Sequence, residues 1–274
     1  MLPLDQLVGW LSVLIALTIL AYRIKAVDVY GAFAAVPIGF ITLSFGGVSW
    51  FLALLSFFLL ASYFTKYKYK QKEFAGFSEK NRGARGWASV LANGGLPALF
   101  AIIYYISGNN NLYLFCYAGS LAFALADTVA TEVGLLSESI PRSILTGRSI
   151  LKGHSGGVTL RGEIAAIAGS LIIGTVFGLL FSSNIGQFII ILVACITSGI
   201  LSTNADSALG ETLQCKYRCA VCDKYSETKI VHCNVVTIRD KGFRLIDNNM
   251  VNILSSFVGA ALCSFFILAF NNLR

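Results

Sequence analysis

The chain has 274 residues, of which 56% are hydrophobic and only 13% charged, and its formal net charge is +7 at neutral pH. A mean hydropathy of +0.72 indicates a protein with several membrane spans and excludes a soluble enzyme held by a single anchor. We therefore expect an all-α, polytopic membrane helical bundle that forms one integral membrane domain over residues 1–274.

Eight apolar segments follow one another along the chain, each of about 16 to 21 residues, close to the roughly 20 that a helix needs to cross the hydrocarbon core. They cover residues 6–22, 29–45, 48–64, 89–107, 111–126, 163–182, 185–205 and 250–270. No basic region precedes the first segment, so we expect a retained helix there and not a cleaved signal peptide.

The basic residues divide the loops into two sets. Of the 21 Lys and Arg, 20 follow the first, third, fifth and seventh segments, whereas the turns FGGVSW, SGNNN and SSNIG carry none. The positive-inside rule then predicts a cell-membrane protein with cytoplasmic basic loops and both termini outside. Most of this charge should face lipid headgroups, as in TKYKYKQK, where Lys66, Lys68, Lys70 and Lys72 read as a surface anchor. We expect no nucleic-acid partner.

Two similar acidic motifs end the fifth and seventh segments. ALADTVATEVG contains Asp127 and Glu132, and TNADSALGETLQ contains Asp206 and Glu211 at the same spacing. Carboxylates near membrane depth are costly, which makes them functional candidates. Positions five apart differ by about 140° around a helix, so each pair either has two roles or straddles a helix break. The alternative is that these carboxylates only neutralise cations of neighbouring loops.

The stretch LKGHSGGVTLRG leads into the sixth segment from the same predicted side. Helix N-termini attract phosphate, glycines allow close approach of the backbone, and hydroxyl and ammonium groups add donors. The stretch does not match the Walker A pattern, and by itself it reads equally well as a flexible turn. Together with the acidic motifs it predicts a phosphate-binding loop, with Thr159 as the helix N-cap. Its candidate residues are Lys152, Gly153, His154, Ser155, Gly156, Gly157 and Thr159.

Further groups fit such a site. Mg²⁺ prefers carboxylate oxygens and keeps substrate phosphates as additional ligands, so we expect it at Asp127 with help from Asp206. Arg85, in NRGARGW, and Arg161 would neutralise phosphate charge. Asn93 adds a polar group to the fourth segment, although capping or an interhelical hydrogen bond would also explain it.

Four cysteines and a histidine lie close together in the loop of residues 212–248. They form the pattern C-x3-C-x2-C-x9-H-C, from Cys215 through Cys219, Cys222 and His232 to Cys233. Four such ligands suffice for a structural Zn²⁺ site, and the spacing of Cys215 makes it the weakest member. Free thiols or a disulfide are the alternatives.

Several of these motifs occur in a known family. The stretches FTKYKYKQK, RGWASVLANGG, ALADTVATEVG, GGVTLRGEIAAIAG, DSALGETLQ and DNNMVNILSS span most of residues 64–256, in order. In them the chain resembles the integral membrane family that includes the plant phytyl-phosphate kinase of vitamin E synthesis and the vertebrate transmembrane protein 19. ADTVATEVG and GGVTLRG are also similar, more distantly, to the catalytic region of CTP-dependent dolichol kinases.

The resemblance implies a Mg²⁺-dependent lipid phosphate kinase that transfers the γ-phosphate of CTP or another NTP to an isoprenoid (phytyl- or geranylgeranyl-type) monophosphate. It implies that Asp127 and Glu132 are catalytic or metal-binding groups. Residues 152–159 would contact nucleotide phosphates, and Asp206 and Glu211 would form a second acidic, metal-binding element.

Two other functions use nearly the same parts. A cytidylyltransferase would release pyrophosphate and leave a CDP-lipid. A transporter or flippase of phosphorylated lipids would use the aspartates for coupling, but its site would lie near the bilayer midplane. The acidic motifs stand at one rim, which favours an enzyme with a soluble cosubstrate.

Overall fold

The computed structural model describes residues 4–74, 83–222, 225–226 and 229–271. Its helices are α1 (Leu4–Arg23), α2 (Val29–Ile41) with the π-helical turn η1 (Thr42–Gly46), α3 (Val48–Lys66), α4 (Tyr69–Phe74), α5 (Trp87–Ile106), α6 (Asn111–Gly134), α7 (Leu160–Phe181), α8 (Ile185–Thr212) and α9 (Asn248–Asn271). Among the described residues, seven helices are long and apolar enough to cross a membrane, and α1 adds the shorter apolar stretch Val8–Arg23. The polytopic helical bundle is thereby confirmed.

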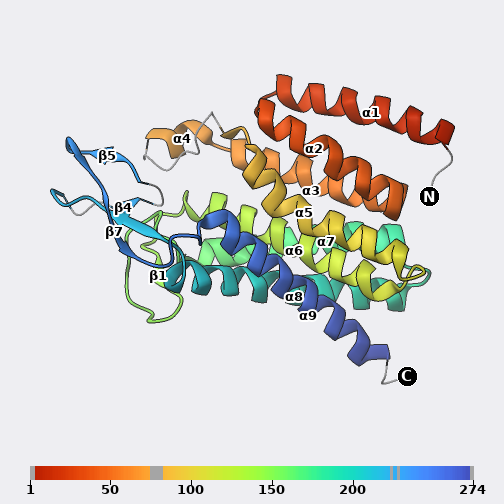
Figure 1. Cartoon of the computed structure of the whole chain (residues 1–274). Helices are drawn as coiled ribbons and strands as arrows, with labels where there is room; N and C mark the ends of the chain where they lie inside the picture. Colours follow the sequence, from red (N-terminus) through yellow and green to blue (C-terminus); the bar gives the residue numbers. More distant parts are fainter. Residues whose placement is uncertain (1–3, 75–82, 223–224, 227–228, 272–274) are drawn as a thin grey trace.

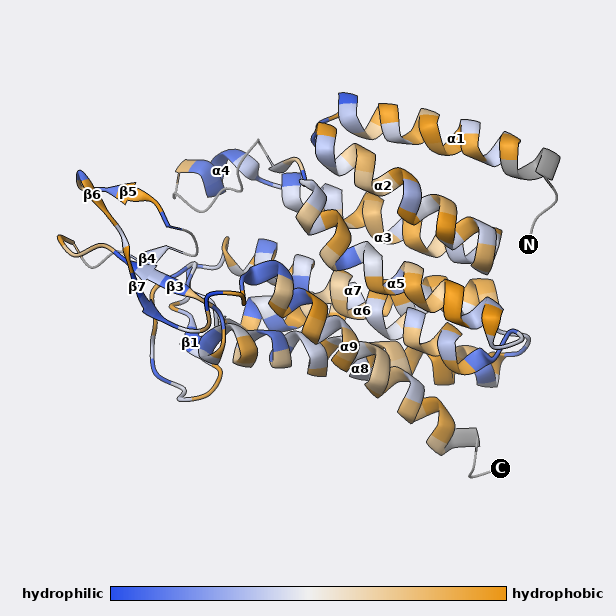
Figure 2. Ribbon diagram, in the orientation of Figure 1, coloured by the Kyte–Doolittle hydropathy of each residue, from blue (hydrophilic) through white to orange (hydrophobic). Residues whose placement is uncertain are grey.

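Helix α6 lies at the centre of the bundle. It packs against α3, α5, α7, α8 and α9, whereas α1 lies at the periphery against α2 (Figure 1). The strands and α4 gather at one end, and α1 begins and α9 ends at the opposite end. Figure 2 shows apolar helices and a hydrophilic concentration at the strand-bearing end. We call this end the basic end; it carries the described residues of the loops 24–28, 67–86, 135–159 and 213–247.

The loops of the basic end contain short strands, which the all-α prediction did not include. In the loop 135–159, β1 (Arg142–Ser143) pairs with β2 (Gly157–Val158). The loop 213–247 holds a second set of pairings. Its members are β3 (Lys216–Arg218), β4 (Tyr225–Ser226) and β7 (Ile238–Lys241), which form a three-stranded sheet in the order β4-β3-β7, and β5 (Val231–His232) with β6 (Val235–Val236), which form a separate hairpin.

Two helices extend further than the apolar pattern predicts. The predicted segments end at residues 126 and 205, but α6 runs unbroken to Gly134 and α8 to Thr212. The glycines near the acidic motifs therefore do not break either helix. Each Asp–Glu pair lies on one continuous helix with its two carboxylates on different faces, because five residues turn the helix by about 140°.

Small residues let the central helices approach closely. A Cβ atom on Gly119 of α6 would lie 2.2 Å from the carbonyl oxygen of Gly259 in α9. A Cβ on Gly169 of α7 would lie 3.1 Å from Ala126 of α6, and one on Gly199 of α8 would lie 2.2 Å from an oxygen of α7. Helices in lipid associate through such van der Waals packing. Moving an apolar side chain from lipid to a helix contact gives no hydrophobic gain, because both surroundings are apolar.

The contact between α6 and α9 yields a stability prediction. Gly119→Ala should force these helices apart and destabilise the protein by about 1–3 kcal/mol, the usual cost of overpacking. Gly95→Ala in α5 is the matched control, because nothing lies within 4 Å of its Cβ position. The measurement is the thermal midpoint for loss of the monodisperse protein in detergent. Equal midpoints for the two variants would contradict the close crossing.

Candidate functional site

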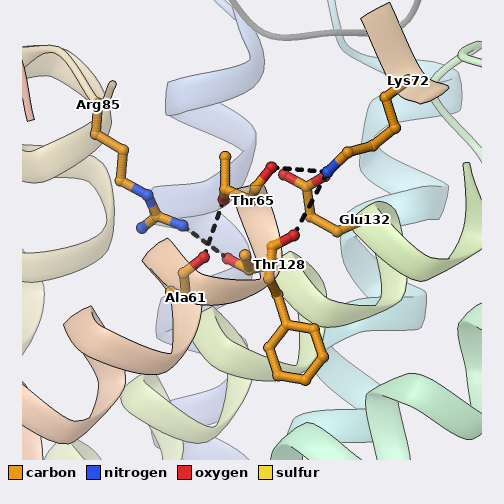
Figure 3. A network of polar contacts seen from close by, with 7 residues as sticks. Ala61, Thr65, Lys72, Arg85, Thr128 and Glu132 are labelled. Atoms are coloured by element: carbon orange, nitrogen blue, oxygen red, sulfur yellow. Dashed lines mark hydrogen bonds and ion pairs between the residues drawn. The ribbon is translucent and has the colours of Figure 1, made fainter. Parts of the chain in front are cut away.

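A buried ion pair joins α4 to α6. The Lys72 ammonium pairs with the Glu132 carboxylate, and the Lys72 side chain is only 2% exposed (Figure 3). Lys72 also donates to the carbonyl oxygens of Thr65, at 2.7 Å, and Phe64, at 3.4 Å. These carbonyls belong to the last turn of α3, which lacks intrahelical donors and attracts a cation. One ammonium group thus ties three helices together.

The interpretation of the lysine run as a surface anchor is wrong for Lys72, which is buried. Lys68 and Lys70 are exposed, as expected of an anchor, whereas Lys66 donates to the carbonyl of Ile24. The alternation of lysine and tyrosine suggested an exposed Lys72. However, α4 is a short helix that directs this residue toward α6, and a pattern of period two does not predict a helix.

Arg85 lies beside the first acidic motif. Its Nη2 atom is 3.4 Å from the Thr128 hydroxyl oxygen (Figure 3). Its charge also interacts with the Asp127 carboxylate. The guanidinium also stands 5.8 Å from the centroid of the Phe57 ring, a cation–π contact. The backbone N–H of Arg85 donates to the carbonyl of Ala26 at 3.0 Å, which fixes the residue against the α1–α2 link. A cation and a carboxylate thus meet at the basic end.

An apolar pocket lies between α1, α2, α3 and α5 and ends at Arg85. It contains about 930 Å³ of empty space, part of it open to the surroundings. The polar side chains among its described lining residues are Thr18, Asn93 and Arg85. Along α1 the lining runs from Leu14 to Ile24, about 15 Å, or half of the roughly 30 Å hydrocarbon core. The pocket is therefore apolar over most of its lining, and Arg85 is its one cationic residue among those described.

Asn93 is buried, and its amide nitrogen donates to the carbonyl of Ser89 one turn earlier, at 2.9 Å. Its side-chain oxygen remains available to the pocket, which Asn93 lines. From the sequence, Asn93 and Arg85 were separate phosphate-binding candidates. In the structure, both residues line the same pocket.

The second acidic motif contacts the glycine-containing loop of residues 151–158, which we call the phosphate loop. The Ser143 hydroxyl lies 2.7 and 2.8 Å from the two carboxylate oxygens of Glu211. Gly156 has a φ of +92°, and a Cβ there would lie 2.5 Å from the Cβ of Glu211. Only glycine allows both this backbone conformation and this approach. Glu211 therefore holds the loop against α8.

Buried polar atoms without partners lie at the same place. The Gln214 side chain is 1% exposed, and neither its amide nitrogen nor its oxygen has a hydrogen-bond partner among the described residues. The Ser155 hydroxyl oxygen is likewise buried and unsatisfied. Both side chains border the Cβ position of Gly210, at 3.2 and 3.3 Å. Unsatisfied buried polar groups are costly and rare, so they mark a position for a polar ligand.

The other residues of the phosphate loop have defined positions. Lys152 donates to the carbonyl of Ser137. The His154 ring packs edge-on against Tyr225, with centroids 5.0 Å apart. Burial, and then the charges of Lys216 and Lys241, lower the pKa of His154, so its ring is neutral at pH 7.

The phosphate loop ends where α7 begins. Gly153 has a φ of +78°, and Gly157 belongs to β2. Thr159 is the N-cap of α7, as expected, and accepts from the N–H of Gly162 at 3.1 Å. Its hydroxyl therefore caps the N-terminus of α7. Arg161 is exposed in the first turn of α7, open to a soluble ligand.

The two aspartates stand at similar depth. Gly199 of α8 abuts the carbonyl of Ala122 in α6, and both helices run toward the basic end. Asp127 follows Ala122 by five residues and Asp206 follows Gly199 by seven, so their levels differ by about 3 Å. Both motifs therefore end at one rim of the bundle.

Sequence reasoning missed one polar contact at this rim. Glu163, in the first turn of α7, accepts a hydrogen bond from the Asn204 amide of α8 at 3.2 Å. The available signal was the acidic residue one turn after the Thr159 cap, a frequent arrangement at helix starts. Glu163 adds a third carboxylate-bearing helix to the rim.

The cysteine-rich loop gathers four of its five candidate ligands. The ligand atoms of Cys219, Cys222, His232 and Cys233 all lie within 4.8 Å of one another, and Cys215 is outside this group. None of the seven cysteines forms a disulfide. Hydrogen bonds from the Cys222 backbone and the His232 side chain lower the pKa of Cys219 to about 6, whereas the neighbouring Cys222 raises that of Cys233 to about 11.

A bundle of long apolar helices with a charged rim at one end defines an integral membrane protein. The family model "Integral membrane protein DUF92" matches residues 12–260. The chain therefore belongs to the DUF92 family of integral membrane proteins, as its motifs indicated.

Among its relatives is an uncharacterised membrane protein of Methanocaldococcus jannaschii, 33% identical over 76% of this chain and 84% of that protein. Protein PGR of Arabidopsis thaliana is 29% identical over 89% of this chain and 90% of its own length. The chloroplastic protein VTE6 of the same plant is 24% identical over 84% of this chain and 62% of its own length. No solved structure matches the chain.

The Lys72–Glu132 pair provides a second prediction. Lys72→Met removes the ammonium partner of a buried carboxylate and should cost about 3–5 kcal/mol of stability. The double variant Lys72→Met/Glu132→Gln should recover most of this loss, because no unpaired charge remains. The exposed Lys70→Met is the matched control and should stay within about 0.5 kcal/mol of the parent protein. Thermal midpoints in detergent report all three, and a Lys72→Met midpoint equal to that of Lys70→Met would contradict the role of the pair.

Proposed function

We propose that the protein is a membrane-embedded kinase that transfers the γ-phosphate of a nucleoside triphosphate, CTP in the first place, to an isoprenoid monophosphate. The observation that carries this proposal is the apolar pocket that ends at Arg85, next to Asp127 and Thr128. Such a pocket suits a substrate with a long apolar chain and a small anionic head. The family resemblance stated above supports a prenyl phosphate as that substrate.

The acceptor would bind with its chain in the pocket and its phosphate at Arg85. Guanidinium groups bind phosphate through charge-assisted hydrogen bonds, which are about twice as strong as neutral ones. The Asn93 side chain, also in the pocket lining, would orient the head group. The acceptor oxygen is already anionic, so its attack on the γ-phosphorus requires no strong general base.

The donor would bind at the phosphate loop. Gly153 would let the backbone approach the nucleotide phosphates, whereas Gly156 packs against Glu211 and Gly157 packs against Pro141. Ser155 and Gln214 have buried polar atoms without partners to offer. Arg161, exposed at the start of α7, adds a cation and the positive end of the helix dipole. Lys152 and His154, in the same loop, would also contact the nucleotide phosphates.

The carboxylates at the rim are the kind of oxygen ligand that Mg²⁺ prefers, and they would hold the ion in the proposed reaction. Asp127 and Asp206 offer oxygen ligands at similar depth, with Glu211 one to two turns further along α8, and the unsatisfied Gln214 amide lies beyond it. When bound, Mg²⁺ supplies charge neutralisation for the donor phosphates. Glu132, which Lys72 already neutralises, would act as a positioning residue that fixes the end of α6.

The decisive experiment incubates the purified protein in detergent with Mg²⁺, phytyl or geranylgeranyl monophosphate, and γ-labelled CTP. Label in a prenyl diphosphate with release of CDP supports the kinase. Pyrophosphate release with an unlabelled CDP-lipid overturns it in favour of cytidylyl transfer. Binding of prenyl phosphate without turnover on any nucleotide overturns it in favour of a lipid carrier.

Asp127→Asn should lower turnover by about 10³-fold or more, because phosphoryl transfer depends on positioned charge. Asp240→Asn, the same change on the exposed strand β7, should leave turnover unchanged. Both variants should elute and melt like the parent protein. An Asp127→Asn variant with full turnover would remove this residue from the mechanism.

Arg85→Gln should raise the KM for the prenyl phosphate by about 10- to 100-fold, the loss expected for a charge-assisted hydrogen bond. The KM for the nucleotide should change much less, since the phosphate loop is a different site. Arg239→Gln, on the exposed strand β7, is the control. If Arg85→Gln raised only the nucleotide KM, the assignment of the pocket to the lipid would be wrong.

A further inference from the structure

The loop between α8 and α9 carries a four-ligand cluster that the proposed kinase chemistry does not use. Cys219 and Cys222 lie in the turn between β3 and β4, and His232 and Cys233 lie where the β5–β6 hairpin turns. Each turn therefore contributes two ligands, although the three-stranded sheet and the hairpin are separate sheets.

The distances suit a single metal ion. Nδ1 of His232 lies 3.4 Å from Sγ of Cys222 and 3.2 Å from Sγ of Cys233. Around a tetrahedral Zn²⁺ with Zn–S of about 2.3 Å and Zn–N of about 2.0 Å, neighbouring ligand atoms lie roughly 3.5–3.8 Å apart. The cluster thus needs only small adjustments to hold zinc with three sulfurs and one nitrogen.

The backbone of the hairpin is shaped for this purpose. In an extended strand, adjacent side chains point to opposite faces of the sheet. His232 and Cys233 could not then bind the same metal ion. Cys233 and Asn234 have φ values of +50° and +60°, the pattern of a type I′ turn. This left-handed conformation, unusual for cysteine, brings Sγ of Cys233 back to the imidazole.

The sheet next to the cluster contacts the phosphate loop twice. The Lys216 ammonium of β3 lies 3.1 Å from the carbonyl oxygen of Ser155. The Tyr225 ring of β4 packs edge-on against His154. Cys219 and Cys222 connect these two strands, so whatever fixes the turn between them also fixes both contacts.

We propose that Cys219, Cys222, His232 and Cys233 bind one Zn²⁺, and that this metal, through Lys216 and Tyr225, holds the phosphate loop in its folded position. The cluster supplies structure and not chemistry, because four protein ligands complete a tetrahedral zinc site and leave no position open. The metal-binding half of this inference is independent of the enzymatic activity.

The first test measures zinc in the full-length protein purified in detergent. Elemental analysis should find one zinc per chain, and the double variant Cys219→Ser/Cys222→Ser should contain none. Cys215→Ser, a change in the same loop outside the cluster, should keep its zinc. A parent protein that stays metal-free after exposure to Zn²⁺, or equal loss of zinc from the Cys215 variant, would overturn the site.

Removal and return of metal tests the parent protein without any substitution. Cobalt added after chelation should give the absorption of a tetrahedral Co²⁺–thiolate centre, and zinc should displace it. Cobalt absorption without thiolate character would overturn the ligand set.

The link to the phosphate loop has its own readout. Trypsin should cleave after Lys152 about tenfold faster once zinc is removed, because local opening becomes easier. Tyr225→Ala should accelerate this cleavage while the zinc content stays at one per chain, and Tyr225→Phe, which keeps the ring, should not. An equal cleavage rate with and without zinc would overturn the link between the zinc cluster and the phosphate loop, whatever the outcome of the kinase assay.

Discussion

The close packing of α6 is the constraint on which the rest of the structure depends. Five helices surround it, and glycines at the contacts, among them Gly119, Gly169 and Gly199, bring backbones within reach of one another. In lipid, where van der Waals packing and not apolar burial drives association, this spacing fixes the relative depth of the helices. It therefore also fixes where Asp127 and Asp206 emerge at the basic end.

The duplicated acidic motif illustrates how the same residues acquire different roles. Since α6 and α8 continue without a break, Asp and Glu of each motif face different neighbours. Glu132 pairs with Lys72 and secures α3 and α4, whereas Glu211 meets Ser143 and supports the phosphate loop. The charge of Asp127 interacts with Arg85, which lines the apolar pocket. The glutamates thus organise the rim, and in the proposed reaction the aspartates would bind ligands.

The basic end has two distinct halves. One half consists of α1, α2, α3 and α5, whose pocket is apolar and ends at Arg85. The other half consists of the loops after α6 and α8, which carry the phosphate loop and the cysteine cluster. Helix α6 runs between them. In the proposed reaction, a lipid substrate and a soluble cosubstrate would thus approach the rim from different sides.

The helical bundle, the shared location of the basic loops and the main polar motifs could all be predicted from the amino-acid sequence. Long apolar runs leave a membrane chain few alternatives to helices, and the charges mark its polar ends. Composition also pointed to the phosphate loop and to the cysteines. Three features could not be predicted in this way: Lys72 is buried, Cys215 lies outside the cysteine cluster, and Arg85 lines an apolar pocket. These features depend on contacts between residues 43 to 60 positions apart and on left-handed turns, which no local period in the sequence encodes.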